Sequence, residues 1–459
     1  MLIHMMGICG TAMASLAGLF KGMGHQVRGS DQNIYPPMST QLEALNIPIL
    51  SGYSADNLKP RPDLVVVGNV ITQSNPEAQA LLVSDIPYTS LPKAMGEYVI
   101  DQRESVVVAG THGKTTTTAM MAAIADECMP GSGFMVGGIP LNHSLSFRPP
   151  QNNWFVIEGD EYDTAFFDKV PKFLHYRPKH VILTSVEFDH ADIYRDLEQI
   201  KQAFRQLIQS IPEEGTLVAH GADPVVRELI AEASCKVVTY GQEQGDYQMG
   251  ARQNISGRNQ FAVKFQGVSV GDLALKSFGP HNSLNALASF ALAHQLGWKT
   301  HQVLQGLANF KGVKRRQEVL GQTKKGATVV EDFAHHPTAV ELTIQAMAEQ
   351  FPEKRVLAVF EPRSATSRRR VFQKDYVRAL SGAHTIYVAS PFDQSRIAEK
   401  DRFSSTELVE DLRSLGRSAH FYPQVDEIVA ALKAEAQAGD VVLIMSNGGF
   451  DNIYAKLLS

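Results

Sequence analysis

An apolar run that leads into a glycine loop and then a helix constrains this chain more than any other stretch. Val106, Val107 and Val108 form a β-branched run typical of a buried strand. The residues after Ala109 are, in order, Gly110, Thr111, His112, Gly113, Lys114, Thr115 and Thr116. In such a loop, glycines let backbone N–H groups approach phosphate oxygens, the helix N-terminus adds partial positive charge, a lysine contacts the terminal phosphates and a hydroxyl ligates Mg²⁺. The stretch therefore predicts an α/β unit that binds a nucleoside triphosphate.

The loop is shorter than the full phosphate-loop pattern. That pattern places its first glycine five residues before the Gly-Lys pair, where this chain has Val108, so Gly110 serves as the first glycine. A chance match in a surface loop is the alternative. The strand, the loop and the helix nevertheless follow in the order that phosphate binding requires, and this order favours the nucleotide site.

Composition limits the class of protein. The chain has 459 residues, which predicts roughly three domains. Its 43 basic and 48 acidic residues give a net charge of -5, so we expect neither nucleic acid nor an anionic membrane as a partner. The three cysteines share no metal-binding spacing, which suits a reducing cytoplasm. The apolar start lacks a basic region and is interrupted by glycines, so we expect no signal peptide or membrane span.

The first hundred residues resemble the start of a nucleotide-binding α/β unit in pattern. A strand over residues 2–6 leads into the turn Gly7 to Gly10, and a helical run and a second strand then end at Asp31. A carboxylate at that place can contact a ribose or a neighbouring sugar. The spacing is Gly-x-x-Gly without the third glycine of the dinucleotide pattern, so a purely structural turn is the alternative. The polar loop over residues 69–77 follows a further strand and is a second candidate site.

Two polar residues in the central segment follow predicted strands. Glu158 comes directly after the apolar run 154–157, and His190 comes shortly after the run 180–184. Because the carboxyl ends of parallel strands meet at one edge of a sheet, we expect Glu158 and His190 to ligate the metal that Thr115 also binds. We expect only helix capping from three other acidic residues, Asp160, Glu161 and Asp163.

The rest of the central segment holds an antiparallel excursion and a pair of asparagines. Residues 247–278 alternate apolar and polar side chains between glycine turns, which predicts antiparallel strands. A helix begins at Pro280, and Asn282 and Asn285 share one of its faces. Spacing alone leaves open whether these two residues bind a ligand or simply cap and cover the helix.

The third segment again alternates strands and helices, which predicts a mostly parallel sheet. Asp332 follows a strand over residues 328–331, and Arg363 follows a strand over residues 356–360. An arginine at a strand end is suited to bind a substrate carboxylate, so Arg363 is a candidate for that role.

Taken in order, these motifs resemble the Mur ligases, the ATP-dependent amide-forming enzymes of peptidoglycan synthesis. The matching residues are Gly110 to Thr116, Glu158, Asp189-His190, His281-Asn282 with Asn285, Arg315-Arg316, and Asp332 with His335-His336-Pro337. The resemblance covers the whole chain. It implies an α/β protein of three domains. A Rossmann-like domain over residues 1–104 would bind a UDP-sugar, and a central P-loop ATPase domain over residues 105–317 would have a mostly parallel sheet. A Rossmann-like ligase domain over residues 318–459 would contact ATP and the peptide substrate.

The resemblance also implies roles for single residues. Lys114, His190 and Arg316 would be catalytic; Thr115 and Glu158 would ligate one Mg²⁺ and His190 a second. The ATP-binding set would be Gly110, Thr111, His112, Gly113, Lys114, Thr115, Thr116, Asn282, Asn285, Arg316 and Asp332. The UDP-sugar set would be Gly7, Gly10, Thr11, Ser30 and Asp31. ATP and Mg²⁺ are thus the expected cofactors.

Two branches of the family compete as the better match. One joins L-alanine to UDP-N-acetylmuramate, and the other joins the recycled murein tripeptide L-Ala-γ-D-Glu-meso-diaminopimelate to the same sugar nucleotide. Residues 158–169, 185–192 and 445–450 resemble the second branch. The peptide would then bind near Arg363, Ser446 and Asn447, where the small residues that follow leave room for a tripeptide.

An alternative function from another class of protein is that of a P-loop NTPase, which drives a partner without ligation. That protein would release phosphate without a carboxylate substrate, whereas a ligase would not. For the ligase we expect a cytoplasmic monomer or weak homo-oligomer with UDP-N-acetylmuramate and a murein tripeptide as substrates, and no nucleic acid or membrane partner.

Overall fold

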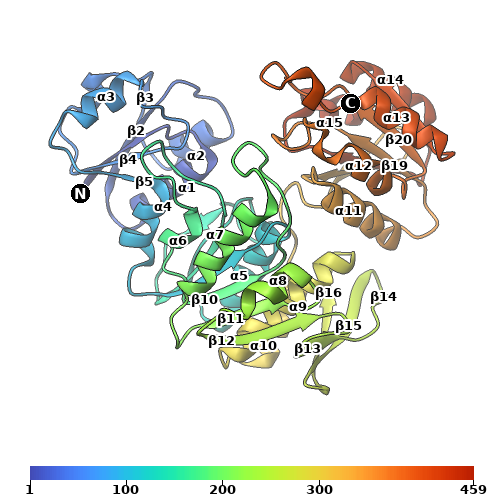
Figure 1. Ribbon diagram of the computed structural model, residues 1–459, viewed down its shortest axis with the longest axis horizontal. Coiled ribbons are helices and arrows are strands. Elements are labelled where there is room, and N and C mark those ends of the chain that lie inside the picture. Colours follow the sequence, from blue (N-terminus) through green and yellow to red (C-terminus); the bar gives the residue numbers. More distant parts are fainter.

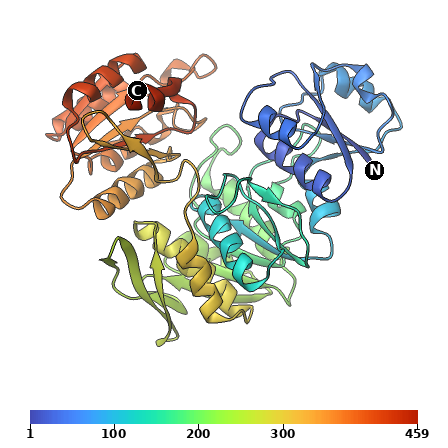
Figure 2. The same ribbon diagram turned by 180° about the vertical axis from the view of Figure 1, so that it is seen from behind.

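The computed structural model describes residues 1–459, which form three α/β parts with a β-sheet each. The N-terminal and C-terminal parts lie on opposite sides of the view, with the central part between and below them (Figure 1). The view from behind shows the same arrangement (Figure 2). Most strand pairs are parallel, and the predicted α/β class is confirmed. None of the helices combines the length and the apolar character that a membrane span needs.

The N-terminal sheet has five parallel strands in the order β3-β2-β1-β4-β5. Its elements are β1 (Leu2–Met6), α1 (Thr11–Gly22), β2 (Gln26–Asp31), α2 (Met38–Ala44), β3 (Ile49–Ser51), η1 (Ala55–Leu58), β4 (Leu64–Val67), α3 (Pro76–Leu82), β5 (Tyr88–Ser90), α4 (Leu91–Ala94) and the π-helix η2 (Met95–Ile100). The turn between β1 and α1 therefore lies at the carboxyl end of the middle strand, where α/β proteins bind ligands.

The central sheet has eleven strands, and its middle runs β12-β11-β10-β6-β9-β7 with parallel pairing. Its strands are β6 (Glu104–Ala109), β7 (Gly133–Met135), β8 (Phe147–Arg148), β9 (Trp154–Gly159), β10 (His180–Leu183), β11 (Thr216–His220), β12 (Lys236–Gly241), β13 (Tyr247–Met249), β14 (Gln253–Ile255), β15 (Arg258–Phe265) and β16 (Val268–Leu275). Its helices are α5 (Lys114–Cys128), α6 (Lys172–His175), α7 (Leu197–Gln209), α8 (Pro224–Ile230), α9 (Pro280–Gln295) and α10 (Thr300–Asn309). Strand β15 pairs antiparallel with β13, β14 and β16, which confirms the antiparallel excursion predicted for residues 247–278.

The C-terminal sheet has the order β17-β18-β22-β19-β20-β21, and only β17 is antiparallel to its neighbour. Its elements are β17 (Glu318–Gln322), β18 (Thr328–Asp332), α11 (Pro337–Gln350), β19 (Val356–Phe360), η3 (Arg370–Phe372), α12 (Gln373–Leu380), β20 (Thr385–Ala389), η4 (Glu399–Asp401), α13 (Ser405–Ser414), β21 (Ser418–Tyr422), α14 (Val425–Glu435), β22 (Val441–Met445), η5 (Phe450–Asn452) and α15 (Ile453–Leu458). The predicted parallel character of this segment is confirmed.

Strand β6 explains why the glycine loop is short. Both of its faces are covered, since Val107 lies in one apolar core and Val108 in another, and both are fully buried. A strand buried on two faces is a continuous apolar run rather than an alternating one. Position 108 is therefore a packing position within the sheet, and the loop begins only at Gly110.

The two junctions of the central part differ in chemistry. Phe20 of the N-terminal part and Phe147 of the central part belong to one apolar core, and Ser15 and Ser146 are hydrogen-bonded at 2.9 Å. No apolar core contains buried residues of both the central and the C-terminal parts. Polar contacts such as the one between Thr366 and Asp189 join those two parts, together with a contact between the rings of Phe188 and Phe372.

We expect Gly18→Ala to destabilise the junction of α1 with β8. A Cβ at position 18 would collide with the ring of Phe147, which is itself buried, so the ring must move. Overpacking of this kind costs about 1–3 kcal/mol, measured as a shift of the urea midpoint. Gly449→Ala is the matched control, since nothing lies within 4 Å of its added Cβ. Equal midpoints for the two variants would contradict the tight packing of α1.

Candidate active site

The glycine loop connects β6 to α5 and leaves the N-terminus of α5 available. Gly110 and Gly113 have φ of 132° and 80°, a range that favours glycine. A side chain at position 110 would collide with Thr184, and a Cβ at position 113 would lie 2.6 Å from Oδ1 of Asn285. Gly113 is the N-cap of α5 and supplies no side-chain cap, so the first N–H groups of the helix can bind an anion.

Lys114 is held by two acceptors inside the protein. Its Nζ donates to the carbonyl oxygen of Gly110 at 2.7 Å and to Oε2 of Glu161 at 2.8 Å. Burial disfavours the charged form of Lys114, but the Glu161 carboxylate outweighs this effect and the pKa of Lys114 is raised. An ammonium group has three donors, so one remains for a phosphate oxygen.

Glu161 was not expected in this site. Its side chain is nearly fully buried, and Oε1 lies 3.3 Å from Nε2 of His190. Burial would raise the pKa of Glu161, but Lys114 and His190 lower it overall. The expectation that Asp160, Glu161 and Asp163 only cap a helix is wrong: no helix begins there, and Asp160 and Asp163 pair with Lys172 and Lys169. The sequence held one signal that could have identified it: a phosphate-loop lysine needs a counter-charge, and no acidic partner had been assigned to Lys114.

Thr115 and Glu158 lie together at the edge of the sheet. Strand β9 is the neighbour of β6, and the Thr115 hydroxyl donates to Oε1 of Glu158 at 2.8 Å while the N–H of Gly137 donates to Oε2 at 2.7 Å. Burial raises the pKa of Glu158, and the nearby Asp160 adds to the shift. A nearby cation would stabilise the charged form of Glu158. The Thr115 hydroxyl and the Glu158 carboxylate are oxygen ligands, which Mg²⁺ prefers.

His190 lies against Glu161, the partner of Lys114. It follows β10, has φ of 53°, and its N–H donates to Oδ1 of Asp189 at 2.7 Å. Burial lowers the pKa of His190, but Glu161 raises it by more. The structure thus places His190 against Glu161, and Glu158 against Thr115.

A cavity of about 360 Å³ lies on one side of the loop. Eight residues of the predicted ATP-binding set line it: His112, Gly113, Thr115, Thr116, Asn282, Asn285, Arg316 and Asp332. The amide of Asn282 also donates to the carbonyl oxygen of Phe278 at 2.8 Å, so this side chain has a structural contact as well. Gly110 does not line the cavity.

A second cavity of about 360 Å³ lies on the other side of the loop. Residues from all three parts of the chain line it, among them Thr11, Thr111, Lys114, Glu158, His190, Arg316 and His335. His112, Gly113, Thr115 and Arg316 line both cavities. The loop is therefore a shared wall, with Lys114 and Glu158 on the side of the second cavity.

Arg316, just before the C-terminal part, and Asp332 within it join that part to this wall. Nη2 of Arg316 lies 3.4 Å from the Thr115 hydroxyl, and its guanidinium lies 4.8 Å from the ring centroid of Phe333. The Asp332 carboxylate accepts the N–H groups of Gln317 and Ala334 at 2.8 and 2.7 Å. Burial raises the pKa of Asp332, although Arg316 and these two N–H groups oppose the shift.

The predicted UDP-sugar residues fall into two groups. Gly7, Gly10 and Thr11 line a smaller cavity of about 160 Å³ at the end of β1. Ser30 is fully buried and donates to Glu77 at 2.8 Å, and Asp31 accepts the N–H of Cys9 at 2.8 Å. The Asp31 side chain thus holds the turn in place, the Ser30 side chain contacts the buried Glu77, and neither lines any of the three cavities described here. Within the loop 69–77, Asn69 lines the small cavity and Glu77 is buried.

The predicted peptide residues cluster around Glu361. Nη1 of Arg363 lies 3.2 Å from Oε1 of Glu361, and the guanidinium stacks at 3.8 Å on the ring centroid of Phe392. The buried hydroxyl of Ser446 donates to the other Glu361 oxygen, and Oδ1 of Asn447 is buried without a partner. This cluster lies outside the linings of the two large cavities.

Comparisons with known proteins cover the whole chain. Three domain families match: the Mur ligase family catalytic domain over residues 2–103, the Mur ligase middle domain over residues 108–293, and the Mur ligase glutamate ligase domain over residues 315–448. A UDP-N-acetylmuramate–L-alanyl-gamma-D-glutamyl-meso-2,6-diaminoheptandioate ligase of Escherichia coli (strain K12) is 38% identical, over 100% of this chain and 98% of its own. A UDP-N-acetylmuramate–L-alanine ligase of Syntrophomonas wolfei is 32% identical, over 99% of this chain and 96% of its own.

A solved structure agrees with these matches. The murein peptide ligase of Psychrobacter arcticus is 34% identical, superposes with a TM-score of 0.73, and covers 100% of this chain and 98% of its own. The fold, the matched domains and the full-length relatives agree with one another, and the chain belongs to the Mur ligase family of ATP-dependent, C–N bond-forming ligases.

Proposed function

We propose that this chain joins UDP-N-acetylmuramate to the tripeptide L-Ala-γ-D-Glu-meso-diaminopimelate at the expense of ATP, in peptidoglycan recycling. The observation that carries the proposal is the position of Lys114, on a wall between two cavities that together involve all three parts of the chain. Sequence identity favours the tripeptide branch, since the Escherichia coli relative that acts on the tripeptide is 38% identical and the L-alanine ligase relative is 32% identical.

Each part of the chain receives one substrate in this proposal. We assign residues 1–104 to the UDP-sugar, residues 105–317 to ATP and residues 318–459 to the peptide; this division follows the three sheets, except that Glu104 is the first residue of β6 in the central sheet. Gly7, Gly10 and Thr11 support the first assignment, because they line a cavity at the carboxyl end of a middle strand.

The nucleotide occupies the first cavity in this proposal, with its phosphates on the glycine loop. Tyr240, Phe310 and Val313 give that cavity an apolar side suited to a planar base. The N–H groups at the start of α5 and the remaining donor of Lys114 then point to the terminal phosphates. We propose Thr115 and Glu158 as ligands of one Mg²⁺ and His190 as a ligand of a second; the ions supply positive charge to the phosphate oxygens.

The reaction needs two steps, because a carboxylate is a poor electrophile toward an amine. An oxygen of the lactyl carboxylate forms a bond to the γ-phosphorus as the β–γ bond of ATP breaks, which yields an acyl phosphate and ADP. Lys114 neutralises charge that develops on the phosphoryl oxygens. The amine of the peptide then attacks the acyl carbon, the amine loses a proton, and phosphate leaves. Arg363 is our candidate for a carboxylate of the peptide, since it follows β19 and its guanidinium has five donors, of which one is directed to Glu361.

The test combines ATP and UDP-N-acetylmuramate with either L-alanine or the tripeptide and follows ADP. We expect almost no ADP from ATP alone, and sustained turnover only when the tripeptide is present. Faster turnover with L-alanine would assign the chain to the other branch. Phosphate release that needs no carboxylate substrate would favour an NTPase without ligation.

A further inference from the structure

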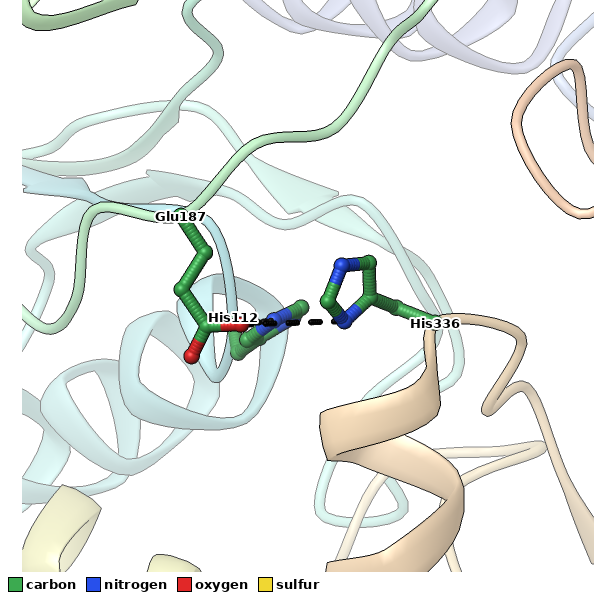
Figure 3. A group of neighbouring side chains, drawn as sticks. All are labelled: His112, Glu187 and His336. Carbon is green, nitrogen blue, oxygen red and sulfur yellow. Dashed lines mark hydrogen bonds and ion pairs between the residues drawn. The ribbon is translucent and has the colours of Figure 1, made fainter. Parts of the chain in front are cut away.

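Three side chains with nitrogen or oxygen donors meet at the edge of the glycine loop, apart from the proposed Mg²⁺ ligands. They are His112 of the loop, Glu187 after β10, and His336 at the N-cap of α11. Figure 3 shows the two imidazoles directed toward each other beside the Glu187 carboxylate. One donor atom from each residue can be chosen so that all three lie within 4.8 Å of one another. We call these three residues the His-Glu-His cluster.

The distances in the cluster fit a small metal ion. Nε2 of His112 lies 3.3 Å from Oε2 of Glu187, and Nδ1 of His336 lies 3.8 Å from the same oxygen. Ligands at about 2.1 Å from a tetrahedral ion are about 3.4 Å apart, so these two separations require shifts of only a few tenths of an ångström.

Hydrogen bonds already fix the form of His336 that a metal requires. Its Nε2 lies 3.2 Å from the carbonyl oxygen of Phe188, which can only accept, so the proton is on Nε2 and Nδ1 keeps its lone pair. A backbone carbonyl that holds the second nitrogen is the usual partner of a metal-binding histidine. The ion would displace a 3.3 Å contact from the N–H of Thr338 to Nδ1.

We propose that the His-Glu-His cluster binds one divalent transition-metal ion of the Zn²⁺ class and thereby fastens the C-terminal part to the glycine loop. Two imidazoles and one carboxylate select such an ion over Mg²⁺, which prefers oxygen ligands. His112 and Glu187 line the nucleotide cavity, and His112 and His336 line the second cavity, so the site lies at the wall between the two. Because His336 comes from the C-terminal part and the other two ligands come from the central part, the complete site exists only when these parts are together.

The competing reading is a hydrogen-bonded contact without a metal. The Thr338 hydroxyl donates to Oε2 of Glu187 at 2.8 Å, and this bond can hold α11 against the central part on its own. The two readings differ in one measurable property, since only the metal site gives transition-metal affinity that depends on both His336 and Glu187.

The experiment titrates the full chain with Co²⁺, followed by visible absorption, and with Zn²⁺, followed by calorimetry, both in saturating Mg²⁺. We expect one ion per chain with the absorption of tetrahedral Co²⁺. Glu187→Gln and His336→Asn are expected to weaken binding by at least about 100-fold. Each variant keeps local structure: glutamine retains the size of Glu187, and asparagine is a good N-cap for α11.

The matched control is His190→Asn, which removes a histidine from the proposed Mg²⁺ set and leaves the His-Glu-His cluster intact. Transition-metal affinity in this variant should equal that of the unaltered chain. Three results would overturn the proposal: no binding by the unaltered chain, unchanged affinity in Glu187→Gln and His336→Asn, or loss of binding in His190→Asn, which would place the ion at the Mg²⁺ ligands. Circular dichroism of each variant establishes that it is folded.

Discussion

Replacing Lys114 with alanine is expected to abolish ATP-dependent turnover and to leave the affinity for the UDP-sugar nearly unchanged. In the proposed mechanism the ammonium of Lys114 neutralises charge on the terminal phosphates, so its loss should lower kcat by at least about 10²–10³-fold. The proposed UDP-sugar residues belong to another sheet and do not contact Lys114. Steady-state assays of ADP release and calorimetry with UDP-N-acetylmuramate measure the two effects.

The same substitution should also destabilise the protein, because Glu161 would lose its buried ammonium partner and keep only His190 at 3.3 Å. Removing one member of a buried ion pair costs about 3–5 kcal/mol, and His190 should offset part of this cost. The double variant Lys114→Ala, Glu161→Gln removes the buried charge, so it should recover most of the stability and none of the turnover. Recovery of turnover in the double variant would show that Lys114 acts only as a structural partner of Glu161. Loss of both substrates' affinities in the single variant would indicate misfolding.

Asp332→Ala should raise the KM for ATP and lower the stability of the junction between the central and C-terminal parts. The Asp332 carboxylate accepts the N–H groups of Gln317 and Ala334 and also lines the nucleotide cavity. Each buried N–H group left without an acceptor costs about 1–3 kcal/mol. Initial rates over a range of ATP concentrations, together with a urea unfolding curve, report both effects.

Asp332→Asn separates the two roles of this residue. Asparagine keeps one oxygen acceptor but loses the charge, so the variant should be more stable than Asp332→Ala. If the charge contributes to nucleotide binding near Arg316, the KM for ATP should still rise. An unchanged KM in both variants would remove Asp332 from the proposed nucleotide contacts.

The order and type of most elements follow from the sequence, because strands buried on both faces are continuous apolar runs. The strands predicted over residues 2–6 and 356–360 are observed with the same bounds, and the strand predicted over 328–331 is observed as Thr328–Asp332. The division of residues 91–100 into α4 and a π-helix does not follow from the sequence pattern. There, Gly96 lies against the carbonyl oxygen of His175, a contact between two parts of the chain that no local pattern reports.

The site was harder to predict where side-chain direction decides the role. Strand ends correctly indicated that Glu158 would lie beside Thr115, because β9 and β6 are neighbours. Spacing could not show that Ser30 points to Glu77 and that Asp31 points to the N–H of Cys9, since both contacts depend on how distant segments pack. It also could not identify Glu161, whose role depends on a lysine 47 residues earlier in the chain.

The difference between the two junctions of the central part has a consequence for motion. Separating α1 from β8 would expose a shared apolar core that includes Phe20 and Phe147, and water cannot replace those contacts. Separating the C-terminal part breaks contacts such as Thr366 to Asp189, and water can form hydrogen bonds with both freed groups. The N-terminal and central parts should therefore move as one rigid body, and the C-terminal part should rotate relative to them. The rate at which the C-terminal part opens should then limit the rate of product release.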